Sequence, residues 1–299
     1  MMQTMHWMHR SKIGISVTMR CLALVLIAGC SEPPTAAPVP DVEDPSDGVV
    51  VDPGAPVDSP HLDLGIPVRA GADDLLVVHP QMALGYNHFL NASSWVSWRT
   101  RPEDFGPVDR YAGQFYADTS LPAEWYRTAH ADLLGSGYDR GHMLRSEERT
   151  RTNDENYATF VMTNVLPQRA DLNRGPWFDF ELYIQRKVES TSAPRDAYVV
   201  AGAVWPAACA PSEPRQLGDG CVDVGQTSDP THRIAVPEAT WKIVVFVDAG
   251  VPLHDAVDPY VVGVLMPNEQ GIADTRWWDY RATVAEVEQA SGYDVPALE

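Results

Sequence analysis

The sequence predicts an α+β fold with a largely antiparallel central sheet flanked by helices. Apolar, β-branched runs of strand length recur along the chain, such as AYVVAGAVW at 197–205 and PYVVGVLMPN at 259–268. Helical periodicity is clear at only two places, and it does not alternate regularly with the strands. Strands that follow one another without helical crossovers favour antiparallel pairing, so an α+β architecture is expected.

Further strands are expected on both sides of a polar middle region. DDLLVVHPQMALGYN (73–87) and SSWVSWRT (93–100) precede this region, and HRIAVPEATWKIVVFVD (232–248) follows it. Inside the region, one strand is expected to begin at Tyr138 and a second to occupy TFVMTNVLPQ (159–168). The middle of the chain therefore adds two short strands to the main set.

Two helices are expected. Four apolar residues after Pro176 recur at helical spacing, namely Trp177, Phe180, Ile184 and Val188. Proline is tolerated in the first turn of a helix, so Pro176 marks the start, and the apolar stripe is expected to face the core. The second helix lies within DYRATVAEVEQASG (279–292), with Gly292 as its stop.

Residues 1–29 have the composition of an export signal. Arg10, Lys12 and Arg20 precede the apolar run CLALVLIAGC, and no acidic residue occurs before Glu32. The run is shorter than the roughly 20 apolar residues of a membrane-spanning helix. We therefore expect a cleaved signal peptide of the lipoprotein type.

The signal ends in IAGC (27–30), which resembles a bacterial lipobox, and Cys30 would then be the lipidated first residue of the mature chain. The alternative is an ordinary signal peptide, with Cys30 incidental and the protein secreted. Residues 30–72 are rich in Pro and Asp and lack periodicity, so we expect a tether. The folded domain is expected at 73–299, anchored to a membrane and facing the periplasm or the exterior.

Cys209 and Cys221 remain once Cys21 is assigned to the signal and Cys30 to the lipid. They flank a loop rich in Pro and Gly, and exported proteins usually oxidise such pairs, so a disulfide is expected. It would stabilise the fold by about 3 kcal/mol on the entropic model. Two free buried thiols or a zinc pair are the alternatives, although no second CxxC or HxxxH motif accompanies the cysteines.

The formal charge of −19 excludes generalised binding of polyanions, because that binding depends on Lys and Arg. The window 139–187 differs from the rest, since it contains as many basic as acidic residues. Any phosphate chemistry must therefore depend on a local site in this window.

Polar residues concentrate at the joints of a strand–strand–helix order in the same window. They are His142, Asn164, Gln168 and Asn173. An imidazole supplies a base near neutral pH. If the helix ran back from Glu181 to Asn173, the two residues would be about 12 Å apart along the axis. One inner metal ligand and one outer carboxylate that holds metal-bound water therefore fit better than two direct ligands.

The motifs DRGH (139–142), NVLPQ (164–168) and NRGPWFDFE (173–181) occur in this order. Together they resemble the DNA/RNA non-specific endonucleases of the ββα-metal (His-Me finger) superfamily. The resemblance covers roughly residues 75–294, and the segment 206–230 departs from it as an insertion. It implies a ββα-metal motif inside the α+β fold.

The resemblance also implies roles for individual residues. His142 corresponds to the general base, Arg140 and Arg110 to the arginines that contact phosphate, and Asn164 to an asparagine that orders the site. Asp139 is expected to be structural, anchoring its turn or the neighbouring arginine.

Asn173 corresponds to the ligand of a divalent metal, magnesium or else manganese or another divalent cation, and Glu181 to the residue that orients metal-bound water. The expected function is therefore metal-dependent hydrolysis of DNA and RNA with little sequence preference. The alternatives are a phosphodiesterase of narrower range and a non-catalytic extracytoplasmic binding lipoprotein. An intact set of His142, Asn173 and Glu181 argues against the binding lipoprotein.

Overall fold

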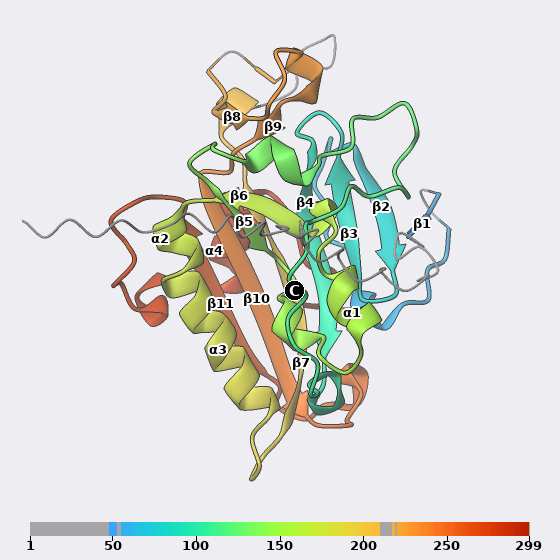
Figure 1. Ribbon diagram of the computed structural model, residues 1–299. Coiled ribbons are helices and arrows are strands. Elements are labelled where there is room, and N and C mark those ends of the chain that lie inside the picture. The colour runs from blue at the N-terminus through green and yellow to red at the C-terminus, as the bar shows by residue number, and fades with distance from the viewer. Residues whose placement is uncertain (1–47, 53–54, 210–216, 219, 299) are drawn as a thin grey trace, which may run out of the picture. The chain divides into compact units, whose positions relative to one another are not determined.

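The computed structural model describes residues 48–52, 55–209, 217–218 and 220–298. Within these residues, one antiparallel sheet dominates the fold (Figure 1). Its strands lie in the order β1 (Val49–Val50), β2 (Asp74–His79), β3 (Met82–Asn87), β4 (Ala92–Thr100), β7 (Arg195–Val204), β10 (Ala239–Asp248), β11 (Tyr260–Pro267) and β12 (Arg281–Ala282). The predicted α+β class and antiparallel sheet are confirmed.

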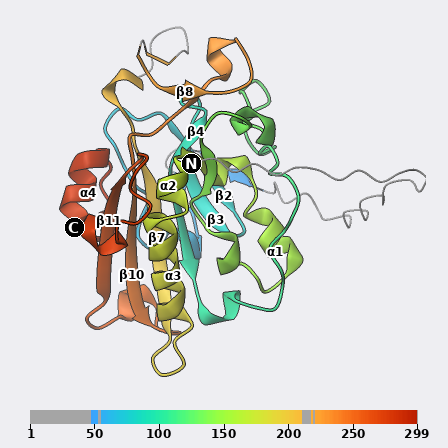
Figure 2. The same cartoon turned by 60° about the vertical axis from the view of Figure 1, so that its left-hand side comes forward.

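Both faces of the sheet are buried, and different helices cover them (Figure 2). α3 (Pro176–Val188) packs against β7 and contributes the predicted apolar stripe to one core. α4 (Val284–Ser291) packs against β11 and inserts Val287 into a second core on the other face. Alternation along β10 serves both cores, because Val244 belongs to the first and Ile243 to the second.

A separate two-stranded sheet positions the polar motifs. β5 (Asp139–His142) pairs antiparallel with β6 (Val165–Gln168), and α2 (Ala170–Asn173) and α3 follow. The predicted strand over 159–168 is shorter than expected, because a 3-10 helix at Met162–Asn164 precedes β6. Between β5 and β6, α1 spans Asn153–Ala158. The order β5, β6, α3 gives the ββα arrangement that the resemblance implies.

Gly175 separates α2 from α3. Its backbone has φ −107° and ψ −117°, and a Cβ there would lie 2.4 Å from the carbonyl oxygen of Asp171. The helical geometry of α3 therefore does not extend back to Asn173, and the separation of 12 Å expected for a continuous helix does not apply. At the other end of the chain, Thr283 caps α4 and Gly292 ends it at φ +74°, as predicted.

The folded region begins earlier than the predicted start at Asp73. β1 pairs with β2, Leu64 is buried in the core beneath α4, and Val68 forms a bridge with Asp294. The expected tether over 30–72 is therefore wrong for its later part, because apolar residues interspersed among its prolines reach the core. The predicted signal and the lipidated Cys30 lie outside the described residues. No helix among the described residues combines the length and apolarity needed to cross a membrane.

The cysteine-bearing segment forms a small unit beside the main sheet. Cys209 and Cys221 are joined by a disulfide, which confirms the predicted pairing. β8 (Asp223–Val224) and β9 (Ile234–Ala235) pair just beyond it. The buried Cys209 packs with Leu90 and Ala235, so the bridge ties the segment to the body of the domain.

Candidate active site

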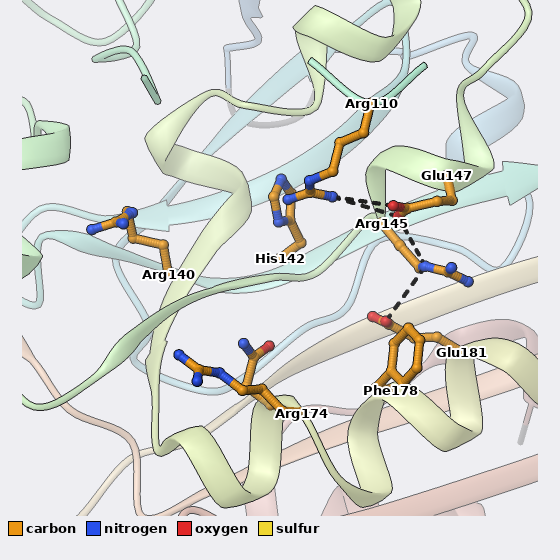
Figure 3. Close-up of a pocket in the computed structure, with 9 residues that line it drawn as sticks. Arg110, Arg140, His142, Arg145, Glu147, Arg174, Phe178 and Glu181 are labelled. Atoms are coloured by element: carbon orange, nitrogen blue, oxygen red, sulfur yellow. Dashed lines mark hydrogen bonds and ion pairs between the residues drawn. The ribbon is translucent and has the colours of Figure 1, made fainter. Parts of the chain in front are cut away.

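The polar motifs meet at an open pocket of about 360 Å³ between β5 and the start of α3 (Figure 3). Its lining consists of Arg110, Arg140, His142, Arg145, Glu147, Asn173, Arg174, Phe178 and Glu181. All of the site residues predicted from the sequence are in this lining except Asn164. The fold thus brings Arg110 together with residues of the ββα unit as far along the chain as Glu181.

His142 ends β5 and is almost completely buried. Its ring packs against Phe115 and Phe160, with ring centroids 4.9 and 5.0 Å away. Burial, reinforced by the positive charges of Arg110 and Arg140, lowers the pKa of His142 to about 3. The imidazole is therefore neutral at pH 7, and its buried Nε2 has no hydrogen-bond partner among the described residues.

Asn164 does not contact the pocket. Its side chain is buried, accepts a hydrogen bond from the backbone N of Leu144 at 2.9 Å, and donates to the carbonyl oxygens of Leu144 and Thr159. These bonds fix the chain two residues beyond His142. Asn164 thus lies behind the pocket and acts on the chain beside His142 as a positioning residue.

Asp139 holds two residues of the pocket lining, Asn173 and Arg174. Its Oδ2 accepts hydrogen bonds from Asn173 Nδ2 at 3.0 Å and Arg174 Nε at 2.7 Å, and its Oδ1 accepts one from Arg174 Nη2 at 2.7 Å. Asp139 was expected to anchor its turn or Arg140, and the arginine that it holds is Arg174 instead. Because the amide nitrogen of Asn173 is held by Asp139, its Oδ1 is left without a protein partner among the described residues.

Glu181 lies one turn into α3 and is 6 % exposed. Its Oε1 is 3.5 Å from Nζ of Lys242, and its Oε2 is 3.9 Å from Nε of Arg145. Burial raises the pKa of Glu181 to about 7, although Lys242 and Arg145 favour the charged form. Lys242 is fully buried beneath the pocket, and burial lowers its pKa in turn.

The arginines of the pocket differ in how they are held. Arg110 donates to Ser146 and approaches Glu147 at 3.4 Å, and Arg145 donates to Glu147 at 3.0 Å (Figure 3). Arg140 lies apart from this chain of ion pairs and has no carboxylate partner among the described residues. Its guanidinium carbon lies 5.5 Å from the centre of the Phe115 ring. Arg140 is thus the pocket cation whose charge is least neutralised by the protein.

Five residues of the site escaped the sequence analysis: Arg145, Glu147, Arg174, Phe178 and Lys242. Lys242 gave a visible signal, because a lysine interrupts the apolar strand ATWKIVVFVD. Arg174 and Phe178 lie inside the motif NRGPWFDFE (173–181), but the resemblance assigns neither of them a role. Their places depend on contacts between distant segments.

The donor set suits a hard cation. Oxygen atoms are the ligands that magnesium prefers, and magnesium keeps most of its waters, so the free Oδ1 of Asn173 and the carboxylate of Glu181 fit it. Among the described residues, no cluster of three or more His, Cys, Asp or Glu side chains could hold a metal. The residues therefore fit a cation held by few protein atoms.

The chain matches the family described as DNA/RNA non-specific endonuclease over residues 64–297. It belongs to this family and is a non-specific nuclease, an enzyme whose substrates are nucleic acids.

Similar proteins agree with this assignment. A nuclease of Nostoc sp. is 34% identical over 94% of this chain and 93% of its own length. Mitochondrial nuclease EXOG of Xenopus laevis is 25% identical over 91% of this chain and 67% of its own. Human mitochondrial endonuclease G is 28% identical over 70% and 65%.

A solved structure of an EndoG/EndoGI complex contains a chain with a similar fold. The TM-score is 0.64 at 21% sequence identity, and the match covers 82% of this chain and 94% of that chain. At this level of identity the likeness concerns the fold alone.

Proposed function

We propose that the chain hydrolyses phosphodiester bonds of DNA and RNA with His142 as general base and a divalent cation, Mg²⁺, beside Asn173. The observation that carries the proposal is the meeting of His142, Asn173, Glu181 and several arginines in one pocket. A base, a cation site and phosphate-binding groups are the three components that hydrolysis of an anionic ester requires.

His142 takes a proton from the attacking water. The neutral imidazole is the form that accepts a proton, and burial ensures this form at pH 7. A pKa of about 3 alone would make the ring a weak base. An anionic phosphate bound between Arg110 and Arg140 offsets the two charges that help to lower the pKa, so the basicity of His142 rises when substrate binds.

Arginines orient the phosphate. Arg140 presents a guanidinium without a carboxylate partner, and guanidinium groups bind phosphate oxygens in a bidentate manner. Arg110 exchanges part of its interaction with Glu147 for the substrate. Arg174 is held rigidly by Asp139, which also fixes the amide of Asn173. The site thus combines one available cation with others already fixed in place.

Asn173 Oδ1 and the Glu181 carboxylate would hold the cation, Asn173 directly and Glu181 through water. When bound, the cation stabilises negative charge on the phosphate and on the leaving oxygen. Burial without a cation favours the protonated form of Glu181. A nearby positive charge favours the carboxylate, so Glu181 accepts hydrogen bonds from water in the loaded site.

A plasmid-nicking assay tests the function. The purified chain with Mg²⁺ should nick and linearise plasmid and degrade RNA, and EDTA should stop both reactions, with Mn²⁺ as a second cation. Cleavage of small phosphodiesters without cleavage of plasmid or RNA would indicate the narrower phosphodiesterase. Binding of nucleic acid without any cleavage would indicate the binding lipoprotein.

We further propose that the protein is exported and anchored to a membrane through lipid on Cys30. The support is the basic and apolar leader that ends in IAGC. Cys30→Ala should release the protein from membranes with its specific activity retained, because the site lies in a separate folded domain. Membrane retention of Cys30→Ala, or a fully secreted wild type, would exclude the anchor.

A further inference from the structure

Phe178 is an unusual member of the pocket lining. It is 40 % exposed, whereas Trp177 and Phe180 on the same helix are fully buried. The other lining residues carry charged or strongly polar side chains. The proposed hydrolysis of phosphodiester bonds assigns no role to an exposed phenyl ring.

The ring is held on the pocket side of α3. Phe178 and Glu181 are three residues apart and share one helix face. Arg145 lies over the ring with its guanidinium carbon 5.3 Å from the centroid. Hydrogen bonds to Glu147 and Gln185, each 3.0 Å long, fix Arg145 in turn. The ring is thus oriented before any ligand arrives (Figure 3).

We infer that Phe178 forms a stacking subsite for an unpaired nucleobase next to the scissile phosphate. The inference rests on the proposed function. The arginines satisfy the anionic backbone of a nucleic acid, and the remaining part of a nucleotide that needs an aromatic partner is the flat face of its base. Aromatic side chains stack on bases of any identity, so the subsite is compatible with low sequence preference.

The subsite favours single strands. In a duplex, each base is already stacked on its neighbours and paired, and exposing one face costs unstacking energy. A base in a single strand or a loop can turn onto Phe178 without that cost. The enzyme should therefore bind unpaired DNA and RNA more tightly than the same backbone without a base.

Matched oligonucleotides test the inference. Dissociation constants are measured in EDTA by fluorescence anisotropy, for a single-stranded DNA and for the same strand with abasic sites in its centre. Removing one base–aromatic stack weakens binding by about 5- to 150-fold. The wild type should therefore prefer the intact strand over the abasic strand by about this factor.

Phe178→Ala should bring the ratio of the two dissociation constants close to one, and Phe178→Trp should restore it. Trp278→Ala is the control, because Trp278 is 45 % exposed and lies beneath Arg276 at 5.4 Å but outside the pocket lining. This control should keep the wild-type ratio.

A ratio near one in the wild type, or an unchanged ratio in Phe178→Ala, would overturn the subsite. An equal loss of affinity for both strands in Phe178→Ala would also overturn the subsite, since that result indicates a general effect on folding or charge. The binding measurement needs no cleavage. Failure of the nicking assay would reject the proposed function, whereas failure of the binding test would reject only the stacking subsite.

Discussion

The two faces of β10 carry different types of residue. On the face toward α4, Trp241 and Ile243 are wholly buried among apolar residues. On the face toward the pocket, Thr240 accepts a hydrogen bond from Gln168, and Lys242 lies 3.5 Å from Glu181. One strand therefore supports an apolar core on one side, whereas on the other side a buried ionic floor under the active site adjoins apolar residues such as Val244.

The difference between the two faces indicates which residues are present for function and not for the stability of the fold. An apolar face is stabilised by burial alone, at about 25 cal/mol per Å². A buried ion pair stabilises the fold much less, because desolvation offsets the attraction between the charges. Burial opposes the charged forms of both Glu181 and Lys242, since it raises the pKa of the first and lowers the pKa of the second. The buried ion pair on the pocket side therefore contributes less to the stability of the fold than the apolar residues on the opposite face.

Lys242→Met should cause the largest change in stability, because it leaves Glu181 buried without its closest cation. Loss of one partner from a buried pair typically costs about 3–5 kcal/mol. Ile243→Val on the opposite face should cost about 0.5–1.5 kcal/mol. Urea unfolding at pH 8 measures both variants, and adding Glu181→Gln to Lys242→Met should recover most of the loss. Equal effects of the two single changes would remove the distinction between the faces.

His142→Ala should reduce nuclease activity by about 100-fold or more, which is the range of general-base catalysis. Binding of Mg²⁺, followed by calorimetry, should stay close to that of the wild type because His142 is not one of the proposed cation ligands. Near wild-type turnover in this variant would show that another group accepts the proton.

Asn173→Ala should weaken Mg²⁺ binding by at least about tenfold, since even outer-shell residues have effects of this size. Additional Mg²⁺ should then restore part of the rate, and Asn173→Asp should keep more affinity than Asn173→Ala because a carboxylate oxygen can take the same position. Rates measured against Mg²⁺ concentration decide the matter. An unchanged metal requirement in Asn173→Ala would contradict the assignment.

Acid should destabilise the protein through His142. The unfolded chain takes up a proton near pH 6.5, whereas the folded ring stays neutral down to about 3, so stability falls as the pH decreases between these values. The contribution is about 1.4 kcal/mol per pH unit. His61, whose pKa burial lowers to about 4, acts in the same direction. Urea titrations at pH 7 and 5 should show a smaller loss for His142→Gln than for the wild type.

The sequence predicted those parts of the site that depend on local order. DRGH (139–142), Asn173 and Glu181 lie within one ββα unit, and the resemblance of their motifs to the nuclease family implied that they meet. Lys242 lies far along the chain, and its contact with Glu181 exists only because β10 runs beneath α3. Asp139 belongs to the predicted motif, but its partners depend on the break at Gly175, which local patterns did not reveal.

In the fold, too, the elements specified by local sequence patterns were predicted, and those that depend on distant contacts were not. Alternating and β-branched runs specified the long strands, because each of them must bury at least one face. β1 spans only Val49–Val50 and has no periodicity to detect, and its place in the sheet depends on pairing with Val77 and Val78. The early start of the domain was therefore missed, since proline-rich composition outweighed a few buried apolar residues.

The bridge between Val68 and Asp294 bears on when a newly made chain can finish folding. Two backbone hydrogen bonds of 3.0 and 2.9 Å join these residues, and the carbonyl oxygen of Leu64 accepts one from Ala297. A ribosome-bound chain lacks these partners until residues 294–297 have been synthesised, and contacts so distant in sequence form slowly. The complete nuclease fold therefore forms only after residues 294–297 have left the ribosome.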